Sequence, residues 1–443
     1  MHLTRRVLSL AVPAFAALLA HPLMLLADTW IVGRLGTAQL AGLSIGSGLL
    51  LTVVGLSIFL AYGSTAVVAR LVGGGERRRG LEMGMQAIWV AAALGLAVAL
   101  IMWPLAALLA QVLGADAVTL PYAVAYLRWS LPGLPGMLMM LGATGTFREL
   151  ADARTPLVLS LASAAVNLVL NLLFVFGAGM GIAGAALGTA VAETALGLVA
   201  TVLVAGHARR LGARLAPVWA DMRHSLLVGF PLWLRTLLLR AALLLTTYVA
   251  ARQGAAALAA HHIAMNVWNL LAYALDALAI AGQTIIATAL GAGEPAEARR
   301  FTAAMVRWAV GGGLILGLAA VLARIPIAAA FSTDPQVKSI VAHLLLIVGA
   351  TLALAGYVYL IDGVLIGAGD GAYLAKAGLI NLAVYAPLAL LALLLPAGEP
   401  ALLGLWVAFT VGFMGARAVT LGLRARGDRW LIVDAQGPGG GSV

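Results

Sequence analysis

The sequence predicts an all-α membrane protein with twelve transmembrane helices in two parallel six-helix repeats. Hydrophobic residues make up 63% of the 443 residues and charged residues only 10%, with a mean hydropathy of +1.04. Soluble domains carry about 25% charged residues. Apolar stretches recur along the whole chain, and most have the ~20 residues that a helix needs to cross ~30 Å of hydrocarbon. An internal duplication is the third observation.

Twelve apolar stretches define the predicted helices. We expect them at residues 7–34, 42–72, 83–112, 119–146, 157–177, 181–206, 223–251, 260–290, 302–324, 337–366, 374–396 and 401–423. Some contain proline, which membrane helices tolerate because neighbouring groups satisfy the freed backbone atoms. Bends are therefore expected at Pro13, Pro22, Pro132, Pro135 and Pro231.

The basic residues predict the orientation. With the N-terminus in the cytoplasm, most of the 27 lysines and arginines fall on the cytoplasmic side, and Arg34, Arg252, Arg324 and Lys338 fall on the other. This is the positive-inside pattern. It predicts a multi-pass protein with both termini in the cytoplasm. The net charge of +10 then reflects topology and contact with membrane lipid, so we expect no nucleic-acid partner.

The chain contains an ungapped duplication. An offset of 218 residues places Pro13 on Pro231 and Arg34 on Arg252. The same offset joins Gly36 with Gly254, Gly75 with Gly293, Glu76 with Glu294, Gly145 with Gly363 and Asp152 with Asp370. Because each half has an even number of helices, the two copies have the same orientation. Parallel repeats are a known transporter plan, with substrate bound between the halves.

The duplication sets the expected domains. Residues 1–206 form the N-terminal lobe, 207–222 a cytoplasmic loop between the lobes, and 223–424 the C-terminal lobe. Residues 425–443 end in "GPGGGSV" and are expected to be a disordered cytoplasmic tail.

Asp28 places a carboxylate inside the first apolar stretch. An aspartate at a helix centre costs roughly 2.5 to 3.5 kcal/mol on insertion scales, so it predicts a function or a partner. The offset leads from Asp28 to Thr246, so the second copy lacks the acid. Two interpretations stay open: a functional ionisable group, or an interfacial aspartate that snorkels to the headgroups or caps the following turn.

Polar residues on two later helices are candidate partners of Asp28. Asn167 and Asn171 are four residues apart and therefore share one helix face, and Thr189 lies on the next helix. They form either a functional polar site or ordinary interhelical hydrogen bonds.

The second half has its own charged residues inside apolar stretches. Arg235, Asp276 and Asp362 are expected to form an ion network, because opposite charges in hydrocarbon pair. A structural bridge from Arg235 to one of the two aspartates is the simpler interpretation, and a second coupling site is the alternative. Arg417 is expected to snorkel toward the cytoplasm.

The sequence holds little that suggests enzymatic or metal chemistry. It has no cysteine, no phosphate-binding G-x-x-x-x-G-K-[ST] and no arrangement of a nucleophile with a base. His261 and His262 are adjacent and point about 100° apart on a helix, so they do not chelate one ion. We expect no enzyme activity, no metal site and no cofactor.

Several segments resemble the multidrug and toxic compound extrusion (MATE) transporters, and most closely their bacterial DinF-like branch. They are "DTWIVGRLGTAQLAG", "FRELADARTPL", "NLVLNLLFVFGAGMGIAGAALGTAVAE", "PLWLRTL" and "AAHHIAMNVWNLLAYALDALAIAGQTIIATALGAGE". The resemblance covers residues 7–424. It implies a V-shaped, two-lobe transporter in the bacterial cytoplasmic (inner) membrane, which exports amphipathic, cationic drugs or toxic metabolites in exchange for H+ or Na+.

The resemblance also implies roles for single residues. The coupling acid of the family matches Asp28, and the proline at which that helix bends matches Pro13. The polar residues around the acid match Asn167, Asn171 and Thr189. Some relatives carry aspartate where this chain has Asn171. Since Na+ favours several oxygen ligands and negative charge, H+ coupling is the expectation here.

Two further functions are alternatives. One is a Na+-coupled exporter. The other is a lipid-linked oligosaccharide flippase of the same superfamily, which needs a strongly cationic cavity. The expected substrate is a small amphipathic organic molecule, and the expected oligomeric state is a monomer.

Overall fold

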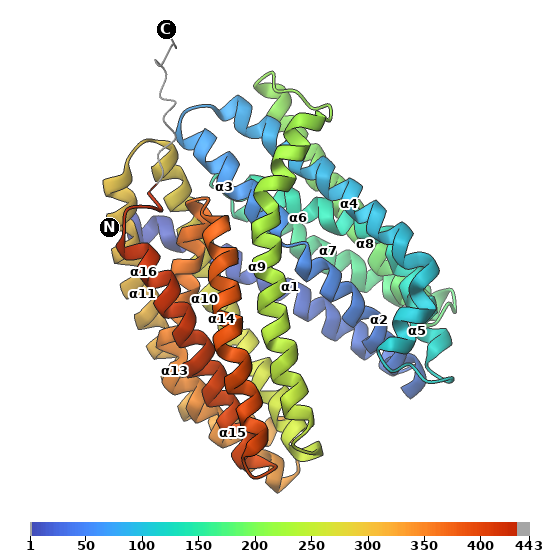
Figure 1. Cartoon of the computed structure of the whole chain (residues 1–443). Helices are drawn as coiled ribbons and strands as arrows, with labels where there is room; N and C mark the ends of the chain where they lie inside the picture. Colours follow the sequence, from blue (N-terminus) through green and yellow to red (C-terminus); the bar gives the residue numbers. More distant parts are fainter. Residues whose placement is uncertain (1, 432–443) are drawn as a thin grey trace. The chain divides into compact units, whose positions relative to one another are not determined.

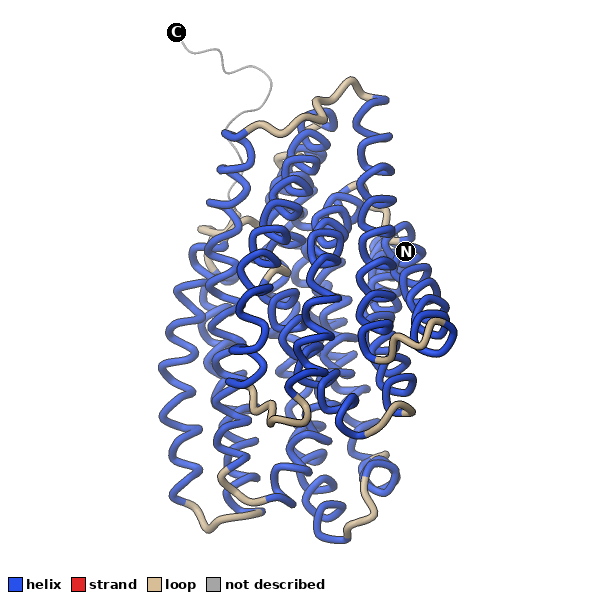
Figure 2. Tube along the Cα trace, turned by 90° about the vertical axis from the view of Figure 1, so that its right-hand side faces the viewer, coloured by secondary structure: helices blue, strands red, loops and turns tan. Residues whose placement is uncertain are grey.

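The chain is built of helices joined by short loops. The computed structural model describes the backbone of residues 2–431, and within that range all side chains except those of residues 2–4, 6, 21, 62–66 and 149. No strand occurs in the described range, as Figures 1 and 2 show. The predicted all-α class is confirmed.

The first half contains the helices that correspond to the first six predicted spans. They are α1 (His2–Gly33), α2 (Thr37–Leu56), α3 (Phe59–Gly73), α4 (Arg77–Val112), α5 (Leu120–Ser130), η1 (Leu131–Gly133), α6 (Leu134–Glu149), α7 (Arg154–Leu172), η2 (Leu173–Gly177) and α8 (Ile182–Arg210).

The second half repeats this plan. Its elements are α9 (Trp219–Ala251), α10 (Ala255–Gly291), α11 (Pro295–Leu322), α12 (Arg324–Phe331), α13 (Pro335–Gly367), α14 (Gly371–Leu391), η3 (Ala392–Leu394), α15 (Glu399–Val407), η4 (Ala408–Phe413) and α16 (Met414–Arg426).

The described residues contain eleven stretches of helix that are long and apolar enough to cross a membrane, where twelve helices are predicted. The difference lies at the predicted span 119–146. Pro132 and Pro135 divide it into α5 with 11 residues, η1 and α6 with 16 residues, and each α-helix is shorter than the ~20 residues of a span. Proline lacks the backbone donor and clashes with the preceding turn. The fourth predicted span, 119–146, is therefore a broken helix.

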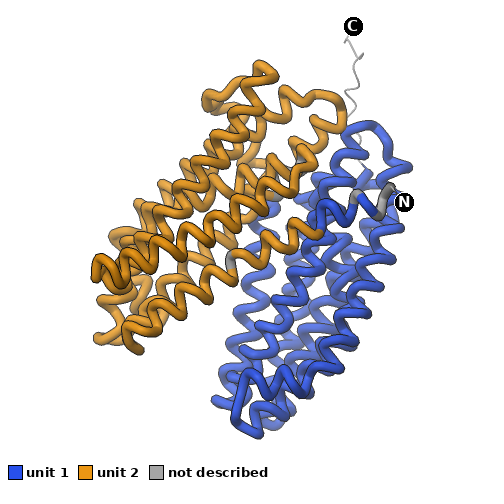
Figure 3. Tube along the Cα trace, turned by 180° about the vertical axis from the view of Figure 1, so that it is seen from behind, with its two compact units in different colours: residues 1–11, 231–443 blue, residues 12–230 orange. Residues whose placement is uncertain are grey.

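Two compact units make up the chain (Figure 3). Unit 2 comprises residues 12–230, and unit 1 comprises the residues up to Ala11 and from Pro231 onward. The division lies near Pro13 in α1 and at Pro231 in α9, the two prolines that the duplication relates. We expected it in the loop 207–222, but this loop belongs to unit 2 because its ordered part is hydrogen-bonded to α4.

Both units use the same close helix packing. In unit 2, α4 packs on α6, and in unit 1 α11 packs on α13. A β-carbon built on Gly95 of α4 would lie 2.6 Å from Pro135 Cα, and one built on Gly313 of α11 would lie 2.9 Å from Ala353 Cα. These two contacts join residue pairs that the 218-residue offset relates. Glycine thus allows the same backbone approach in both copies.

The turns between helices are also repeated. Gly36 and Gly254 both have positive φ, at 130° and 97°, and each directly precedes a helix. At the turn after α6, however, Ala151 has φ 57° where its repeat mate Gly369 has φ 72°. A β-carbon makes the left-handed conformation costly, so Ala151 is strained where Gly369 is not.

The predicted tail 425–443 differs in its first part. Helix α16 runs to Arg426, and Trp430 is buried, with Nε1 donating to the Ala425 carbonyl oxygen at 3.1 Å. An indole that buries its ring and finds a partner for its N–H orders the chain around it. The rest of the predicted tail, 432–443, lies outside the described residues.

We expect Ala151→Gly to raise the free energy of unfolding by about 1 kcal/mol, because glycine adopts a positive φ without the β-carbon penalty. Thermal unfolding of the purified protein in detergent measures the change. Ala178→Gly is the matched control, since Ala178 is also exposed but has φ −92°. The control should lose stability, and equal gains in both variants would contradict the assignment of strain.

Candidate functional site

Asp28 lies on the buried face of α1. Its side chain is 2% exposed, and Met24 and Val32, one turn away on either side, are also buried. Trp30 faces outward and is 56% exposed. The interfacial interpretation requires a side chain that reaches the headgroups, which a buried carboxylate does not do. Asp28 is therefore an internal polar group of unit 2.

The polar residues predicted around Asp28 come together in the structure. Asn171 Nδ2 donates to Asp28 Oδ1 at 2.6 Å, and it also lies 3.3 Å from Asn167 Oδ1. Asn167 Nδ2 donates to Thr189 Oγ1 at 2.8 Å. Thr189 Oγ1 in turn donates to the Ala185 carbonyl oxygen at 3.0 Å. These contacts join α1, α7 and α8 in one buried chain of hydrogen bonds.

Asn171 also has an unused acceptor. Its Oδ1 is buried and has no hydrogen-bond partner among the described residues. A β-carbon on Gly188 of α8 would meet this same oxygen, so only glycine allows α7 and α8 to approach here. Buried acceptors without partners are rare in proteins, and they mark places where water, an ion or a mobile proton is handled.

A small cavity of about 30 Å³ lies beside Asp28. Its polar lining comes from Asp28, Ser47, Tyr126 and Thr189, and apolar residues of α1, α2 and α6 complete it. This volume accommodates about one water molecule, which needs two or more polar partners. Organic ligands occupy pockets of about 300 to 1,000 Å³. The space beside Asp28 is therefore sized for water in this conformation.

Two residues of this site were missing from the prediction. Ser47 of α2 and Tyr126 of α5 are both buried. A β-carbon on Gly46 would lie 2.5 Å from Tyr126 Cδ1, so the glycine lets the ring pack against α2. The only signal in the sequence was a serine and a tyrosine inside apolar stretches, which also fits ordinary packing.

In unit 1, Asp362 is hydrogen-bonded to one arginine and forms an ion pair with a second. Arg235 Nε donates to Asp362 Oδ1 at 3.0 Å, and Arg235 Nη2 pairs with Asp362 Oδ2. Arg417 Nη2 lies 3.5 Å from the same oxygen, and Arg417 is 5% exposed. The expectation that Arg417 snorkels is therefore wrong, because it pairs with Asp362. Of the two candidate partners of Arg235, the structure shows Asp362, while Asp276 is half-buried on α10.

The repeat-related position of the Asp28 site is also polar but carries no carboxylate. Thr246 Oγ1 and Tyr385 Oη are 2.5 Å apart and both residues are buried. Thr246 and Tyr385 occupy the positions that the offset relates to Asp28 and Asn167. Nearby, His261 is buried, with Nε2 3.3 Å from Thr247 Oγ1. The second copy thus keeps the contact between its first and fifth helices with neutral groups.

No group of three or more His, Cys, Asp or Glu side chains gathers in the part of the chain that the structure describes. His261 is buried and His262 is exposed, so the adjacent histidines point to different surroundings. The chain of hydrogen bonds from Asp28 to Thr189 offers one carboxylate, two amides and a hydroxyl group.

We expect Asp362→Asn to lower the free energy of unfolding by about 3 to 5 kcal/mol, because two buried arginines lose their shared carboxylate. A double variant, Arg235→Met with Asp362→Leu, should recover part of this loss. It leaves one buried arginine without a carboxylate, whereas Asp362→Asn leaves two. Thermal unfolding in detergent compares the two. Unchanged stability of Asp362→Asn would show that the ion pair contributes nothing.

The family model MatE matches the chain twice, at residues 13–173 and 231–391. Both matches are related by the predicted offset, which confirms the duplication. "Protein DETOXIFICATION 44, chloroplastic" from Arabidopsis thaliana is 28% identical over 435 residues, which cover 93% of this chain and 80% of that protein. "DNA damage-inducible protein F" from Escherichia coli K12 is 28% identical over 419 residues, with 93% and 90% covered.

Solved structures share the fold. The Vibrio cholerae MATE transporter VcmN in its bent form matches with a TM-score of 0.87 and 22% identity, over 97% of this chain and 99% of that one. A MOP superfamily transporter from Pyrococcus furiosus matches with a TM-score of 0.85 and 20% identity, over 96% and 95%. The doubled family match covers most of the sequence. The chain therefore belongs to the MatE family of multi-pass membrane transporters, the MATE family, and its similarity to the DNA damage-inducible protein F agrees with a DinF-like member.

Proposed function

We propose that the protein is an H+-coupled antiporter that exports amphipathic, cationic organic compounds through protonation of Asp28. The observation that carries the proposal is the buried hydrogen-bond chain from Asp28 through Asn171 and Asn167 to Thr189. A relative named "Multidrug resistance protein MdtK" from Edwardsiella ictaluri, 24% identical over 443 residues, supports multidrug export as the activity.

The composition of the site favours a proton over Na+. A Na+ site gains from several oxygen ligands and from negative charge, whereas Asp28 is the one carboxylate in this hydrogen-bond chain, and Asn171 turns its amide hydrogens toward it. The cavity beside Asp28 accommodates a water molecule that can bring a proton to the carboxylate. Coupling by H+ therefore needs only the Asp28 carboxylate and a water molecule in this cavity.

Protonation would reverse the contact between α1 and α7. The ionised Asp28 accepts a hydrogen bond from Asn171 Nδ2, whereas a protonated Asp28 has an O–H to donate. Asn171 Oδ1 has no partner, so it can accept that hydrogen after the amide turns. The lost charge and the turned amide change how α1 packs, and the prolines Pro13 and Pro22 inside α1 allow the helix to bend.

This movement of α1 means that the substrate and the proton do not occupy the Asp28 site at the same time. With Asp28 ionised, the site attracts a cationic compound, and with Asp28 protonated that attraction is lost. In the structure the space beside Asp28 is sized for water, so substrate entry follows the movement of α1. We place the protein in the bacterial cytoplasmic (inner) membrane as a monomer, with both termini in the cytoplasm.

The flippase alternative finds no support in unit 2. A pyrophosphate-bearing substrate needs buried cationic side chains, and none of the buried described side chains in residues 12–230 is an arginine or lysine. The buried arginines of the described chain are Arg235 and Arg417, which share Asp362.

We expect Asp28→Asn to reduce dye export, driven by an imposed pH gradient in inverted membrane vesicles, to the background of empty vesicles. The amide has no proton to exchange at neutral pH. Thr246→Val, at the repeat-related position, is the matched control and should export as wild type does. If Asp28→Asn exports as much dye as the wild-type protein, proton coupling through this residue is refuted. If a Na+ gradient alone drives export by the wild-type protein, the coupling ion is Na+.

We expect Asn171→Asp to make export respond to an imposed Na+ gradient, because a second carboxylate beside Asp28 supplies the charge and oxygens that Na+ favours. The same vesicle assay measures it. Asn381→Asp, which adds a carboxylate at a buried asparagine of α14, is the control and should leave export independent of Na+. A Na+ response in both variants, or in neither, would contradict the assignment of the coupling site.

A further inference from the structure

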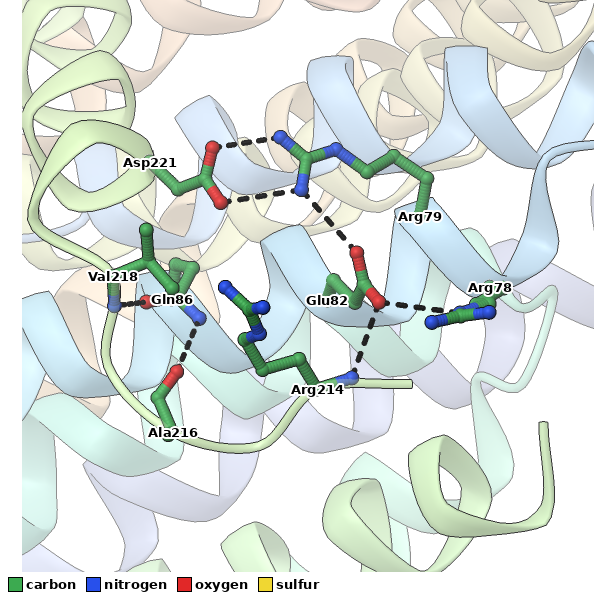
Figure 4. Close-up of polar contacts among 8 residues, drawn as sticks. All are labelled: Arg78, Arg79, Glu82, Gln86, Arg214, Ala216, Val218 and Asp221. Carbon is green, nitrogen blue, oxygen red and sulfur yellow. Dashed lines mark hydrogen bonds and ion pairs between the residues drawn. The ribbon is translucent and has the colours of Figure 1, made fainter. Parts of the chain in front are cut away.

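The loop that joins the two halves is fastened to α4 (Figure 4). Gln86 Nε2 donates to the Ala216 carbonyl oxygen at 3.0 Å, and the Val218 backbone N–H donates to Gln86 Oε1 at 2.8 Å. Gln86 is 1% exposed. One buried amide thus satisfies a donor and an acceptor of the loop, which holds residues 211–218 against the beginning of α4.

A polar cavity of about 250 Å³ lies where this loop, the start of α4 and the start of α9 meet. It is lined by Arg78, Arg79, Glu82, Gln86, Arg214 and Asp221. All six residues belong to unit 2. The cavity has room for several water molecules or for a small hydrated anion. We call it the arginine cavity.

The charges of the arginine cavity are incompletely paired. Arg79 contacts both oxygens of Asp221, at 2.7 and 3.2 Å, and Glu82 at 3.2 Å. Arg78 Nε lies 3.3 Å from Glu82, whose carboxylate also accepts the backbone N–H of Arg214 at 3.1 Å. Arg214 is exposed, and its guanidinium makes no hydrogen bond or ion pair to the other residues drawn in Figure 4. Three guanidinium groups face two carboxylates, which leaves one excess positive charge.

The position of these arginines opposes the helix dipole. Helix α4 begins at Arg77, and its first turn contains arginines and no acidic residue. Positive charge at a helix N-terminus is unfavourable, and the free N–H groups there favour an anion. A bound anion would offset both the dipole and the excess charge.

Two tryptophans indicate the depth of the arginine cavity in the membrane. Trp89 is 41% exposed, and its Nε1 donates to the Leu215 carbonyl oxygen at 2.9 Å. Trp219, at the start of α9, is 72% exposed. Exposed tryptophans of membrane proteins lie at the level of the lipid headgroups. At that level the abundant anions are lipid phosphates, and the cytoplasmic leaflet is rich in anionic lipid.

We propose that the arginine cavity binds a phosphate group of an anionic lipid headgroup, with Arg214 and Arg78 as its main contacts. A guanidinium binds phosphate oxygens through paired, charge-assisted hydrogen bonds, which suits an arginine without a partner. A phosphate held there joins the loop between the halves to α4 and to the membrane surface. Inorganic phosphate has the same recognition chemistry, so the experiment separates the two sources.

The test uses the full-length protein purified in neutral detergent. The probes are dioctanoyl phosphatidylglycerol and, separately, inorganic phosphate, and the readout is the rise in unfolding temperature with probe concentration. In Arg214→Gln we expect the half-saturating concentration of the lipid to rise about tenfold, the effect of losing one charge-assisted contact. Arg209→Gln is the matched control, because Arg209 is exposed, outside the cavity and carries the same charge. It should bind as wild type does.

Each outcome decides the proposal. If inorganic phosphate stabilises the wild-type protein, and stabilises Arg214→Gln less, the ligand of the arginine cavity is free phosphate. The proposed recognition of a phosphate group is then confirmed, and its source in a lipid headgroup is refuted. If neither probe stabilises the protein, or if Arg214→Gln and Arg209→Gln respond alike, the site is refuted. Should Arg214→Gln fail to fold, Arg78→Gln takes its place, because Arg78 contacts the other residues drawn in Figure 4 through one exposed ion pair, with Glu82. None of these measurements depends on transport.

Discussion

The structure depends on the requirement that polar groups inside an apolar helix bundle find internal partners. A carboxylate or guanidinium in hydrocarbon is costly unless it is paired or hydrogen-bonded. Asp28 meets the requirement through Asn171 at 2.6 Å, and Asp362 meets it through Arg235 and Arg417. Each pairing fixes which helices are neighbours. In the proposed mechanism, protonation of Asp28 acts through this requirement, because a change of charge alters the hydrogen bond that joins α1 to α7.

The two copies have kept their packing and changed their chemistry. Gly95 approaches Pro135 as Gly313 approaches Ala353, so backbone spacing is preserved. At the position of Asp28 the second copy has Thr246, which contacts the Tyr385 hydroxyl instead of an asparagine. Packing in a membrane bundle depends on small residues that any transporter half needs. The carboxylate at this position, in contrast, is present in one copy and replaced by a threonine in the other, as the proposal of coupling through Asp28 requires.

Helices α1 and α9 each contribute residues to both units. The divisions lie near Pro13 and at Pro231, where proline removes a backbone hydrogen bond and weakens the helix. Helix α1 also carries Asp28, so one continuous element connects a weak point to the proposed coupling site. The loop between the halves, by comparison, is held to α4 by Gln86.

The sequence by itself determined the helical class, the duplication and the residue types of the site, because hydropathy, repeated prolines and glycines, and a carboxylate in an apolar stretch are local signals. It also brought Asn167 and Asn171 onto one helix face by their spacing. Only the tertiary structure decided that Asp362 pairs with Arg235, that Arg417 is buried beside it, and that Ser47 and Tyr126 line the cavity at Asp28. The burial of Trp430 was decided there too. The reason is that these features depend on which helices meet, and contacts between residues far apart in the chain leave no periodic trace in it.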